Sequence, residues 1–325
     1  MGSPSHAGAQ SAPPSPPAFS RTLVACLLLA LAAALWGGNS VIGRALRDDI
    51  SPIVLSFWRW IFTFAGASLI AGRELWQKRA LVRRHLPFLA LVALVGTGPN
   101  NAFAFWALKY TTSVNMQLFN STIPLWVMLI SWVGLGSRAG ASELIGLAVS
   151  LAGVLVIVAG GDWHNLRSLA INGGDLIILV SFVFWALYVV LIKFRPEGFS
   201  LFAFIAILAA LGALELLPFA LFAAGGESAA FFPTTPRVLG GALYLGIVAS
   251  LIANCAHYHG IAVVGPARSA LFVHLVPVFG VALSAAVLGE HLEPFHAAGF
   301  ALVLAGLWIA NRQRDTARPT PLDAV

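Results

Sequence analysis

Long apolar runs separated by short polar stretches occupy most of the chain. They lie at about residues 22–43, 53–72, 86–108, 112–134, 142–161, 174–193, 199–223, 238–260, 266–288 and 295–311. A helix of about 20 apolar residues crosses the hydrocarbon core of a bilayer. Gly or Pro punctuates most of the polar stretches, as expected of turns. The pattern predicts an all-α integral membrane protein with ten transmembrane helices.

The two ends of the chain lack these runs. Residues 1–21 are rich in Ser, Pro, Ala and Gly, which cannot bury a core, and predict a disordered N-terminal tail. This tail lacks the basic start and short apolar core of a secretory signal, so we expect the first run to remain as a helix. Residues 312–325 predict a cytoplasmic C-terminal tail.

Composition agrees with a membrane protein and excludes a soluble one. Hydrophobic residues make up 59% of the 325 residues and charged residues only 10%, against about 25% in soluble domains. The net charge of +6 comes without a basic run interleaved with aromatic residues, so we expect no nucleic-acid partner. Cys26 and Cys255 both lie in apolar runs, which argues against a disulfide framework and against a metal site.

The Lys and Arg residues are distributed unequally between the two sides of the predicted helices. Of the 19, 13 fall on the side that holds both termini, 5 fall on the other side, and Arg59 lies inside a helix. Positive residues concentrate in cytoplasmic loops. We therefore expect a multi-pass protein of the cell inner (plasma) membrane with both termini in the cytoplasm.

The two halves of the chain repeat each other. A shift of 153 residues matches Asn101 with Asn254, Pro124 with Pro277, Gly146 with Gly299 and Gly153 with Gly306, and a shift of 149 matches Trp36 with Trp185 and Arg44 with Lys193. The repeats are expected at residues 22–161 and 174–311, with five helices each. Because five is odd, the two copies must insert in opposite orientations. Secondary transporters use such inverted repeats around a substrate site near the bilayer midplane.

Several segments resemble EamA-type members of the drug/metabolite transporter superfamily. They are Leu35–Ser40, Phe57–Trp60, Ala107–Ser113, Asn115–Pro124 and Leu288–Glu290. The resemblance covers residues 22–311 and implies two inverted five-helix repeats, a central cavity and export of small metabolites or amino acids. It also implies that the first four helices of each repeat surround the cavity. The second repeat departs from the first, because it has no arginine that matches Arg59.

Two ionisable residues fall inside predicted helices, Arg59 in the second and Glu215 in the seventh. Such residues are costly in a membrane and usually face a cavity or each other. Both are expected in the same half of the bilayer, within about one helical turn in depth. We expect Arg59 to bind substrate and Glu215 to be the coupling candidate, either as a pair or both facing the cavity. The alternatives are an Arg59 that extends towards the surface and a protonated Glu215.

The third predicted helix is interrupted by the Gly- and Pro-containing segment Gly96–Asn101. Proline removes a backbone hydrogen bond and kinks a helix, and the freed carbonyls need side-chain or water partners. We interpret the segment either as a hinge beside a polar pocket or as a packing kink. The matching stretch 249–254 has neither Gly nor Pro, so only the first repeat is expected to be kinked.

Aromatic and amide side chains recur on helix faces that the repeat relates. Aromatic walls with a few hydrogen-bonding groups suit an amphipathic solute, whereas the same side chains also hold helices together. We interpret the set as the wall of a substrate cavity. Besides Arg59, its members are Trp36, Asn39, Asn101, Phe105, Asn115, Gln117, Asn120, Trp185, Tyr188, Asn254, His257, Tyr258 and His274.

Other clusters are interpreted as structural. His257 and His259 point to different sides of a helix, so no metal site is expected there. The loop residues with metal-binding side chains are Glu290, His291, Glu293 and His296, and we expect them in a solvated loop. Gly146, Gly153, Gly299 and Gly306 are expected to let helices pack closely, within the chain or between subunits of a homodimer.

Secondary transport by alternating access, with no enzymatic activity and no cofactor, is the leading function. An ATP-driven pump would need a Gly-rich phosphate loop, which the sequence lacks. A channel-like facilitator is the alternative within transport. An intramembrane enzyme and a non-transporting scaffold are less favoured, since all aspartates lie at helix ends or in loops and a scaffold needs no repeats. Proton coupling would use Glu215, His257 or His274, whereas uniport or exchange needs none of them.

Overall fold

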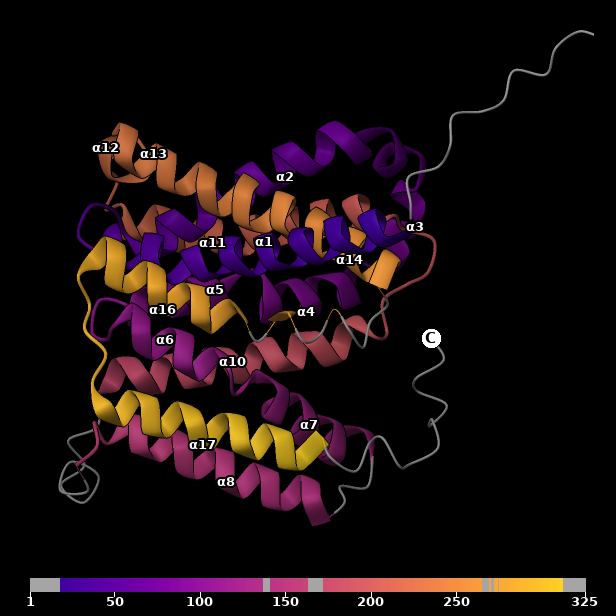
Figure 1. The fold of residues 1–325 in the computed structure, drawn as a ribbon. Coiled ribbons are helices and arrows are strands. Elements are labelled where there is room, and N and C mark those ends of the chain that lie inside the picture. The colour runs from indigo at the N-terminus through magenta and orange to yellow at the C-terminus, as the bar shows by residue number, and fades with distance from the viewer. Residues whose placement is uncertain are drawn as a thin grey trace, which may run out of the picture.

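The computed structural model describes residues 18–136, 141–162, 172–264, 269, 272–273 and 275–311. Long helices lie side by side across the molecule (Figure 1). The first half holds α1 (Ala18–Ala45), α2 (Pro52–Gln77), α3 (Arg79–Arg84), α4 (Leu86–Gly96), α5 (Pro99–Ala107), α6 (Ser113–Asn120), α7 (Ile123–Leu135) and α8 (Ala141–Val158). The second half holds α10 (Gly173–Ile192), α11 (Leu201–Ala223), α12 (Ser228–Phe231), α13 (Pro236–Leu243), the π-helix η1 (Tyr244–Ile252), α14 (Ala253–Val264), α16 (Leu275–Leu288) and α17 (Pro294–Asn311).

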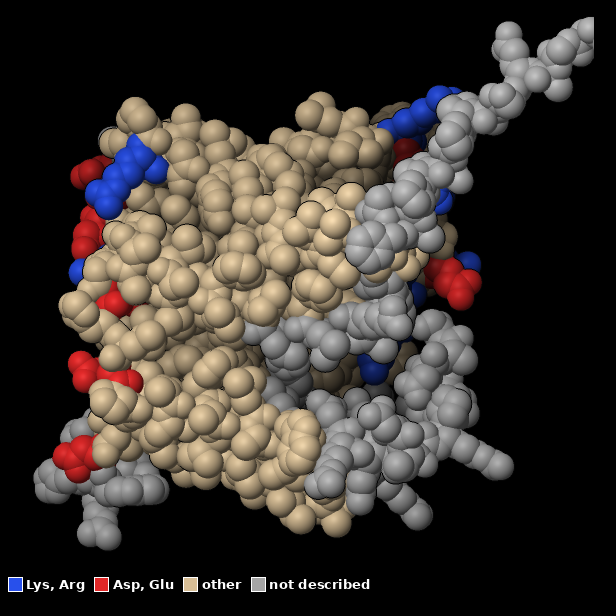
Figure 2. All heavy atoms as spheres, in the orientation of Figure 1, with Lys and Arg blue, Asp and Glu red and all other residues tan. Residues whose placement is uncertain are grey.

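The ten apolar runs are helical over most of their described residues. Among the described residues, six helical segments are long and apolar enough to cross a membrane: Arg21–Ala45, Pro52–Gln77, Leu86–Ala107, Gly173–Ile192, Leu201–Ala223 and Pro236–Val263. The pair α6 and α7, bent by 47°, makes a seventh, and α8, α16 and α17 contain shorter apolar stretches. Charged side chains gather at two opposite edges of the face in Figure 2, with a broad uncharged band between them. The predicted all-α membrane fold is confirmed.

Polar side chains cap the N-termini of several helices in the short stretches between the apolar runs. Thr112, Asn172, Ser200 and Thr235 each stand before a helix and accept a hydrogen bond from a backbone N–H of its first turn. Such caps satisfy amides that have no partner inside the helix. α1 begins at Ala18, ahead of the predicted run, and the predicted tails beyond it, 1–17 and 312–325, lie outside the described residues.

Helices α8 and α17, the fifth of each repeat, pack against each other. Ser150 Oγ donates to Val303 O at 3.1 Å, and these two residues are separated by the repeat shift of 153. Gly153 lies against the backbone of Gly299, so a Cβ atom there would clash. Equivalent residues thus meet across a pseudo-twofold axis, and the glycines predicted to allow close packing do so within one chain.

Many of the other helix contacts occur in pairs that the same axis relates. α1 packs against α14 and α16, and its equivalent α10 packs against α4, α5, α6 and α7. α2 packs against η1, and its equivalent α11 packs against α4. α2 and α11 also pack against each other, as α8 and α17 do. The two repeats therefore interlock rather than form separate bundles.

The equivalent helices α1 and α10 run in opposite directions. Arg44, in the last turn of α1, donates to Leu108 O. Asn172, just before α10, donates to Tyr110 O at 2.8 Å. Both helices therefore meet the same end of α5, one with its last turn and the other with its first. This arrangement confirms that the repeats are inverted.

Candidate functional site

Arg59 lies on α2 and is buried, with 8% of its surface exposed. Its Nε donates to Ser250 Oγ on η1 at 3.2 Å, and its Nη1 donates to Asn101 Oδ1 on α5 at 3.1 Å. The guanidinium carbon lies 4.9 Å from the ring centroid of Trp60 and 5.9 Å from that of Phe105. Arg59 therefore joins α2, α5 and η1 through neutral partners.

The close approach of η1 to α2 depends on Gly246, because a Cβ atom there would lie 2.6 Å from Arg59 O. Thr63 Oγ1 lies 2.8 Å from Arg59 O and 3.0 Å from Gly246 O and fastens the two helices. Ser250 Oγ donates to a carbonyl five residues earlier, which fits the wider π-helical turn. The second repeat is therefore also irregular at this depth, although residues 249–254 include neither Gly nor Pro.

The break between α4 and α5 lies beside Asn101. The helix ends at Gly96 and resumes at Pro99. Asn101 Nδ2 donates to Gly96 O at 3.0 Å, and Thr97 Oγ1 donates to Leu208 O of α11 at 3.0 Å. Side chains thus bind carbonyls at and around the break, as irregular backbone inside a membrane requires.

Glu215 on α11 reaches the same break from another helix. A Cβ atom on Gly98 would clash with Glu215 Oε2, and this oxygen is buried without a hydrogen-bond partner in the described part of the chain. The salt bridges among the described residues join other side chains, so Arg59 and Glu215 do not pair. Each contacts the break instead, Arg59 through Asn101 and Glu215 at Gly98.

The aromatic residues of the predicted cavity wall form two groups. Trp36 of α1 and His257 of α14 have ring centroids 5.0 Å apart, and Trp36 Nε1 donates to a backbone carbonyl of η1 at 3.1 Å. Trp185 and Tyr188 of α10 have centroids 4.8 Å apart. The Tyr188 ring covers Gly96, where a Cβ atom would clash with it. The first group lies against the π-helix and the second against the end of α4.

The other predicted residues are more scattered. Asn254 of α14 donates to the backbone carbonyl of Ser250 in η1. Asn39 Oδ1 is buried without a hydrogen-bond partner in the described part of the chain. Tyr258 is 40% exposed, and Asn120 is partly buried. His274 lies outside the described residues.

A second polar cluster joins α1, α6 and α16. Gln117 Nε2 donates to Ser40 Oγ at 2.6 Å and to a carbonyl of α1 at 2.9 Å. Ser113 Oγ lies 2.7 Å from Ser40 Oγ and 2.8 Å from Ser284 Oγ. A Cβ atom on Gly37 would lie 2.7 Å from the backbone of α16, so the helices meet closely. Three helices are therefore held together by buried hydroxyl and amide groups.

Glu290 completes this cluster. Its two oxygens accept hydrogen bonds from the backbone N–H groups of Ser113 (3.1 Å) and Val114 (3.0 Å), at the N-terminus of α6, where a helix favours negative charge. Arg44 Nε lies 3.5 Å from Glu290 Oε1, and the Glu290 side chain is 12% exposed. We call the set Ser40, Arg44, Ser113, Gln117, Ser284 and Glu290 the Glu290 network, and the end of the bundle that holds it the Glu290 end.

A chain of hydrogen bonds continues from α6 to α10 and α17. His296 Nδ1 accepts from Glu293 N at 3.0 Å, so Nε2 carries the proton and donates to Asn115 Oδ1 at 2.9 Å. Asn115 Nδ2 donates to Asp175 Oδ1 at 3.1 Å, and Thr111 Oγ1 donates to the same oxygen. Asp175 and His296 are both buried. Asn115, predicted to bind substrate, therefore joins helices here.

The positions of Glu290 and His296 contradict the expected solvated loop. His291 and Glu293 are exposed as expected, but Glu290 is partly buried and His296 is buried. Gly289, with φ of 67°, reverses the chain after α16, which places the Glu290 carboxylate on the free amides of α6. Within the described ranges, no group of three or more His, Cys, Asp or Glu residues is arranged to hold a metal ion.

The Glu290 network is matched only in part in the other repeat, where the shifts of 149 and 153 place Arg44 at Lys193 and Ser284 at Ser131. The shifts of 149 and 153 place Ser40, Ser113, Gln117 and Glu290 at the positions of Val189, Pro266, Ala270 and Ser137. Val189, Pro266 and Ala270 have no side-chain group that hydrogen bonds. The sequence therefore repeats this network only in part at the other end of the inverted pair.

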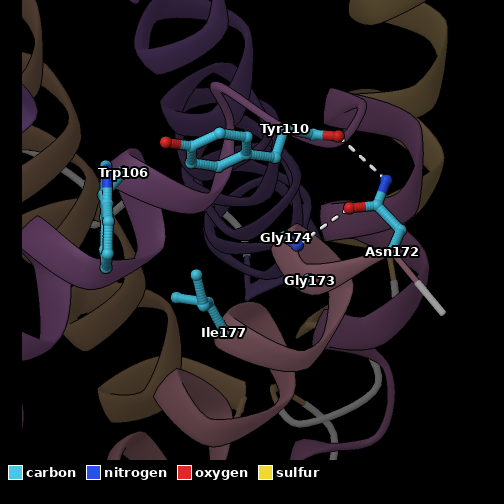
Figure 3. A pocket seen from close by; sticks show the side chains of 6 residues that line it. All are labelled: Trp106, Tyr110, Asn172, Gly173, Gly174 and Ile177. Carbon is cyan, nitrogen blue, oxygen red and sulfur yellow. Dashed lines mark hydrogen bonds between the residues drawn. The ribbon is translucent and has the colours of Figure 1, made fainter.

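An open pocket of ≈ 500 Å³ lies near the Glu290 end, between α5 and α10 (Figure 3). Its lining is Trp106, Tyr110, Asn172, Gly173, Gly174 and Ile177, none of which is a predicted substrate-binding residue. Asn172 Nδ2 donates to Tyr110 O, and Asn172 Oδ1 accepts from Gly174 N, both at 2.8 Å. The pocket is therefore separate from the surroundings of Arg59.

Comparison with known proteins matches the chain to one family. The EamA-like transporter family matches residues 23–159 and 172–312, one segment in each half. An uncharacterized transporter of Archaeoglobus fulgidus is 30% identical over 296 residues, which is 89% of this chain and 97% of the relative.

Two further relatives have names that state what they move. A probable amino-acid metabolite efflux pump of Salmonella typhimurium is 27% identical over 90% of this chain and 97% of its own length. A probable terminal-alkyne amino-acid exporter of Streptantibioticus cattleyicolor is 25% identical over 88% of this chain and 92% of its own length.

Proposed function

The chain belongs to the EamA-like transporter family, and from this premise we propose that it is a secondary transporter that exports small metabolites such as amino acids by alternating access. Transport without ATP fits a sequence that has no Gly-rich phosphate loop. The relatives named as an exporter and an efflux pump favour export of amino-acid-like compounds. No enzymatic step belongs to this proposal.

The Glu290 network is the observation that carries the proposal. It fastens α1, α6 and α16 at one end through an ion pair, two helix-terminal amides and a set of hydroxyl groups. The matching positions of the other repeat cannot form the same bonds. Two inverted halves that are closed by different side chains fit a carrier that opens its two ends in turn.

The proposal also gives an orientation. α1 ends and α17 begins at the Glu290 end, so the described chain starts and finishes at the opposite end. The sequence analysis assigns 13 of the 19 Lys and Arg residues to the side that holds both termini, and positive residues favour the cytoplasm. The Glu290 end therefore faces the outside of the plasma membrane, and both termini are cytoplasmic.

Flux through purified protein in liposomes tests the function. The probes are radiolabelled L-leucine, L-phenylalanine and L-threonine, each with and without a pH gradient. A carrier gives saturable uptake that unlabelled substrate on the other side accelerates. Uptake that never saturates and shows no such acceleration would support the channel-like alternative. Absence of flux for all three probes would contradict transport of this class and favour a scaffold.

A cross-link tests alternating access at the Glu290 end. Ser113→Cys and Ser284→Cys, in a chain with Cys26 and Cys255 replaced by alanine, place two thiols where hydroxyl oxygens lie 2.8 Å apart. Oxidation is expected to stop flux and reduction to restore it, because the Glu290 end must open in each cycle. Ser113→Cys alone is the matched control. Undiminished flux through the oxidised double variant would overturn the mechanism.

A further inference from the structure

Arg59 is a buried cation that has no acidic partner among the described residues. Only 8% of its surface is exposed, and the salt bridges in the described part of the chain involve Arg44, Arg47, Lys78 and Arg237 instead. A buried charge that lacks a counter-ion is strongly destabilising. Because helix packing alone does not offset this cost, we look for a functional role of the Arg59 charge.

The guanidinium of Arg59 has spare donors. Arginine offers five N–H groups in a planar fork, and Arg59 uses Nε towards Ser250 and one Nη1 hydrogen towards Asn101. The second Nη1 hydrogen and both Nη2 hydrogens have no acceptor within the described chain. The bonds to Ser250 and Asn101 fix the plane of the fork, and its free N–H groups suit the two oxygens of a carboxylate.

A second unsatisfied donor lies beside the fork. Trp60 Nε1 is buried and has no hydrogen-bond partner among the described residues. The Trp60 ring and the Phe105 ring are within 5.9 Å of the Arg59 guanidinium carbon. The site thus combines a cation, an indole N–H and two apolar ring surfaces, which suits an anion attached to an apolar body.

Glu215 does not fill this role. It is the acidic residue of the neighbouring helix α11, which packs against α2. Its Oε2 lies against Gly98, whereas Arg59 reaches the break through Asn101. Because Glu215 Oε2 itself lacks a hydrogen-bond partner in the described chain, the two groups leave each other unsatisfied. Within the described part of the chain, Arg59 therefore has no counter-ion.

We propose that the free edge of the Arg59 guanidinium, held by Ser250 and Asn101 and flanked by Trp60 and Phe105, binds the carboxylate of the transported compound. This inference rests on the proposed function and narrows its substrates to carboxylates with an apolar side chain. The compound enters from the end opposite Glu290, binds Arg59 with its carboxylate and leaves when the Glu290 end opens.

The test compares acids with their amides. L-phenylalanine and L-leucine are measured against L-phenylalaninamide and L-leucinamide, by flux in liposomes and by thermal stabilisation of the detergent-solubilised protein. The unmodified protein is expected to favour each acid by about 10- to 100-fold in half-saturating concentration, the factor that one charge-assisted hydrogen bond supplies. Arg59→Gln is expected to remove this preference.

Two further variants keep the result interpretable. Arg59→Lys keeps the charge but loses the fork, so a smaller preference for the acid should remain. Arg73→Gln, at an exposed position on the same helix, should behave like the unmodified protein. If Arg59→Gln does not purify as a folded protein, the comparison of Arg59→Lys with the unmodified protein decides the question.

Each outcome separates the carboxylate site from the transport function. Flux without preference for the acid, or a preference that survives in Arg59→Gln and Arg59→Lys, overturns the site and leaves transport standing. Stabilisation by the acids that disappears in Arg59→Gln, with no flux in any condition, supports the site and contradicts transport. Absence of both flux and stabilisation with all four probes overturns both proposals.

Discussion

The inverted repeat relates two helix contacts to each other. One joins α2 to η1, and the other joins α11 to the α4–α5 break. In the first, the Arg59 side chain donates to Ser250 Oγ; in the second, Leu208 accepts from Thr97 Oγ1 with its backbone carbonyl. The shifts of 149 and 153 place Arg59 on Leu208 and Ser250 on Thr97. The inverted repeat therefore keeps the positions of the helices while it changes the charge that they carry.

The same two contacts also differ in which helix contributes the glycine and which contributes the side chain that packs against it. On the α2 side, Gly66 faces Leu251, and on the α11 side Glu215 faces Gly98. The repeat shifts match Gly66 with Glu215 and Leu251 with Gly98. One contact thus packs an apolar side chain against glycine, and the other packs a carboxyl group against glycine. Symmetry sets the geometry, and asymmetric side chains give each half a different chemistry.

The largest effect is expected from Arg59→Leu, which gives the α2–η1 contact the residue type found at the matching position of α11. Arg59→Leu should lower flux at least about 100-fold, because it removes the two charge-assisted hydrogen bonds proposed between the fork and the carboxylate. The free energy of unfolding should stay equal or rise, because a buried unpaired charge is removed. Liposome flux and thermal unfolding measure the two quantities, with Arg73→Leu as control. Full activity of Arg59→Leu would mean that the charge of Arg59 does not make the two contacts different in function.

A smaller effect is expected where α2 and η1 meet backbone to backbone. Gly246→Ala should destabilise the protein by about 3 kcal/mol, the upper range for overpacking, because the new Cβ would meet Arg59 O. Gly240→Ala, which has open space around it, is the matched control. Unfolding by denaturant in micelles gives the difference. Equal stabilities would mean that the two helices do not approach as closely as described.

A third change acts on the second contact. Glu215→Leu should stabilise the protein by about 1–2 kcal/mol, because the buried Oε2 that lacks a partner is removed. If Glu215 couples transport to protons, the same variant should also carry flux that no longer responds to a pH gradient. Flux with and without a gradient, compared with the unmodified protein, decides this. An unchanged response would move coupling away from Glu215.

The smallest effect is expected at Gly66. Gly66→Ala should change stability by less than about 1 kcal/mol, because the higher helix propensity of alanine offsets a clash with flexible side-chain tips of Leu251 and Ile247. Gly72→Ala meets nothing within 4 Å and should be neutral or stabilising. The same unfolding assay applies. A loss as large as that of Gly246→Ala would show that Leu251 cannot yield.

The sequence was sufficient for the scaffold because the scaffold depends on periodic and local signals. Ten apolar runs predict helices by length alone, and the shifts of 153 and 149 predict which helices are equivalent. Gly98 and Pro99 mark the α4–α5 break for the same local reason. The π-helix was not predicted, because it follows from tertiary contacts at Gly246 and Ser250 rather than from a helix-breaking residue.

The chemistry of the Glu290 end was predicted poorly for a different reason. Hydropathy treats Glu290 and His296 as loop residues, and nothing nearby in the sequence indicates the amides of Ser113 and Val114, about 176 residues earlier. The capping residue Thr112 marks a helix start with unpaired amides, and this was the available signal. Likewise, Arg59 and Glu215 were predicted to lie at a similar depth in the bilayer. A similar depth does not determine whether the two side chains contact each other.

The Glu290 carboxylate accepts hydrogen bonds from the first amides of α6. Opening of the Glu290 end therefore requires water to hydrate these groups. When α16 moves away from α6 in the proposed cycle, two backbone N–H groups and the Glu290 carboxylate lose their hydrogen bonds and Arg44 loses its ion pair, and water that enters the gap replaces these partners. We therefore expect hydration of this small polar crevice to limit the rate of the proposed cycle. Osmolytes that lower water activity should slow turnover while leaving half-saturation unchanged.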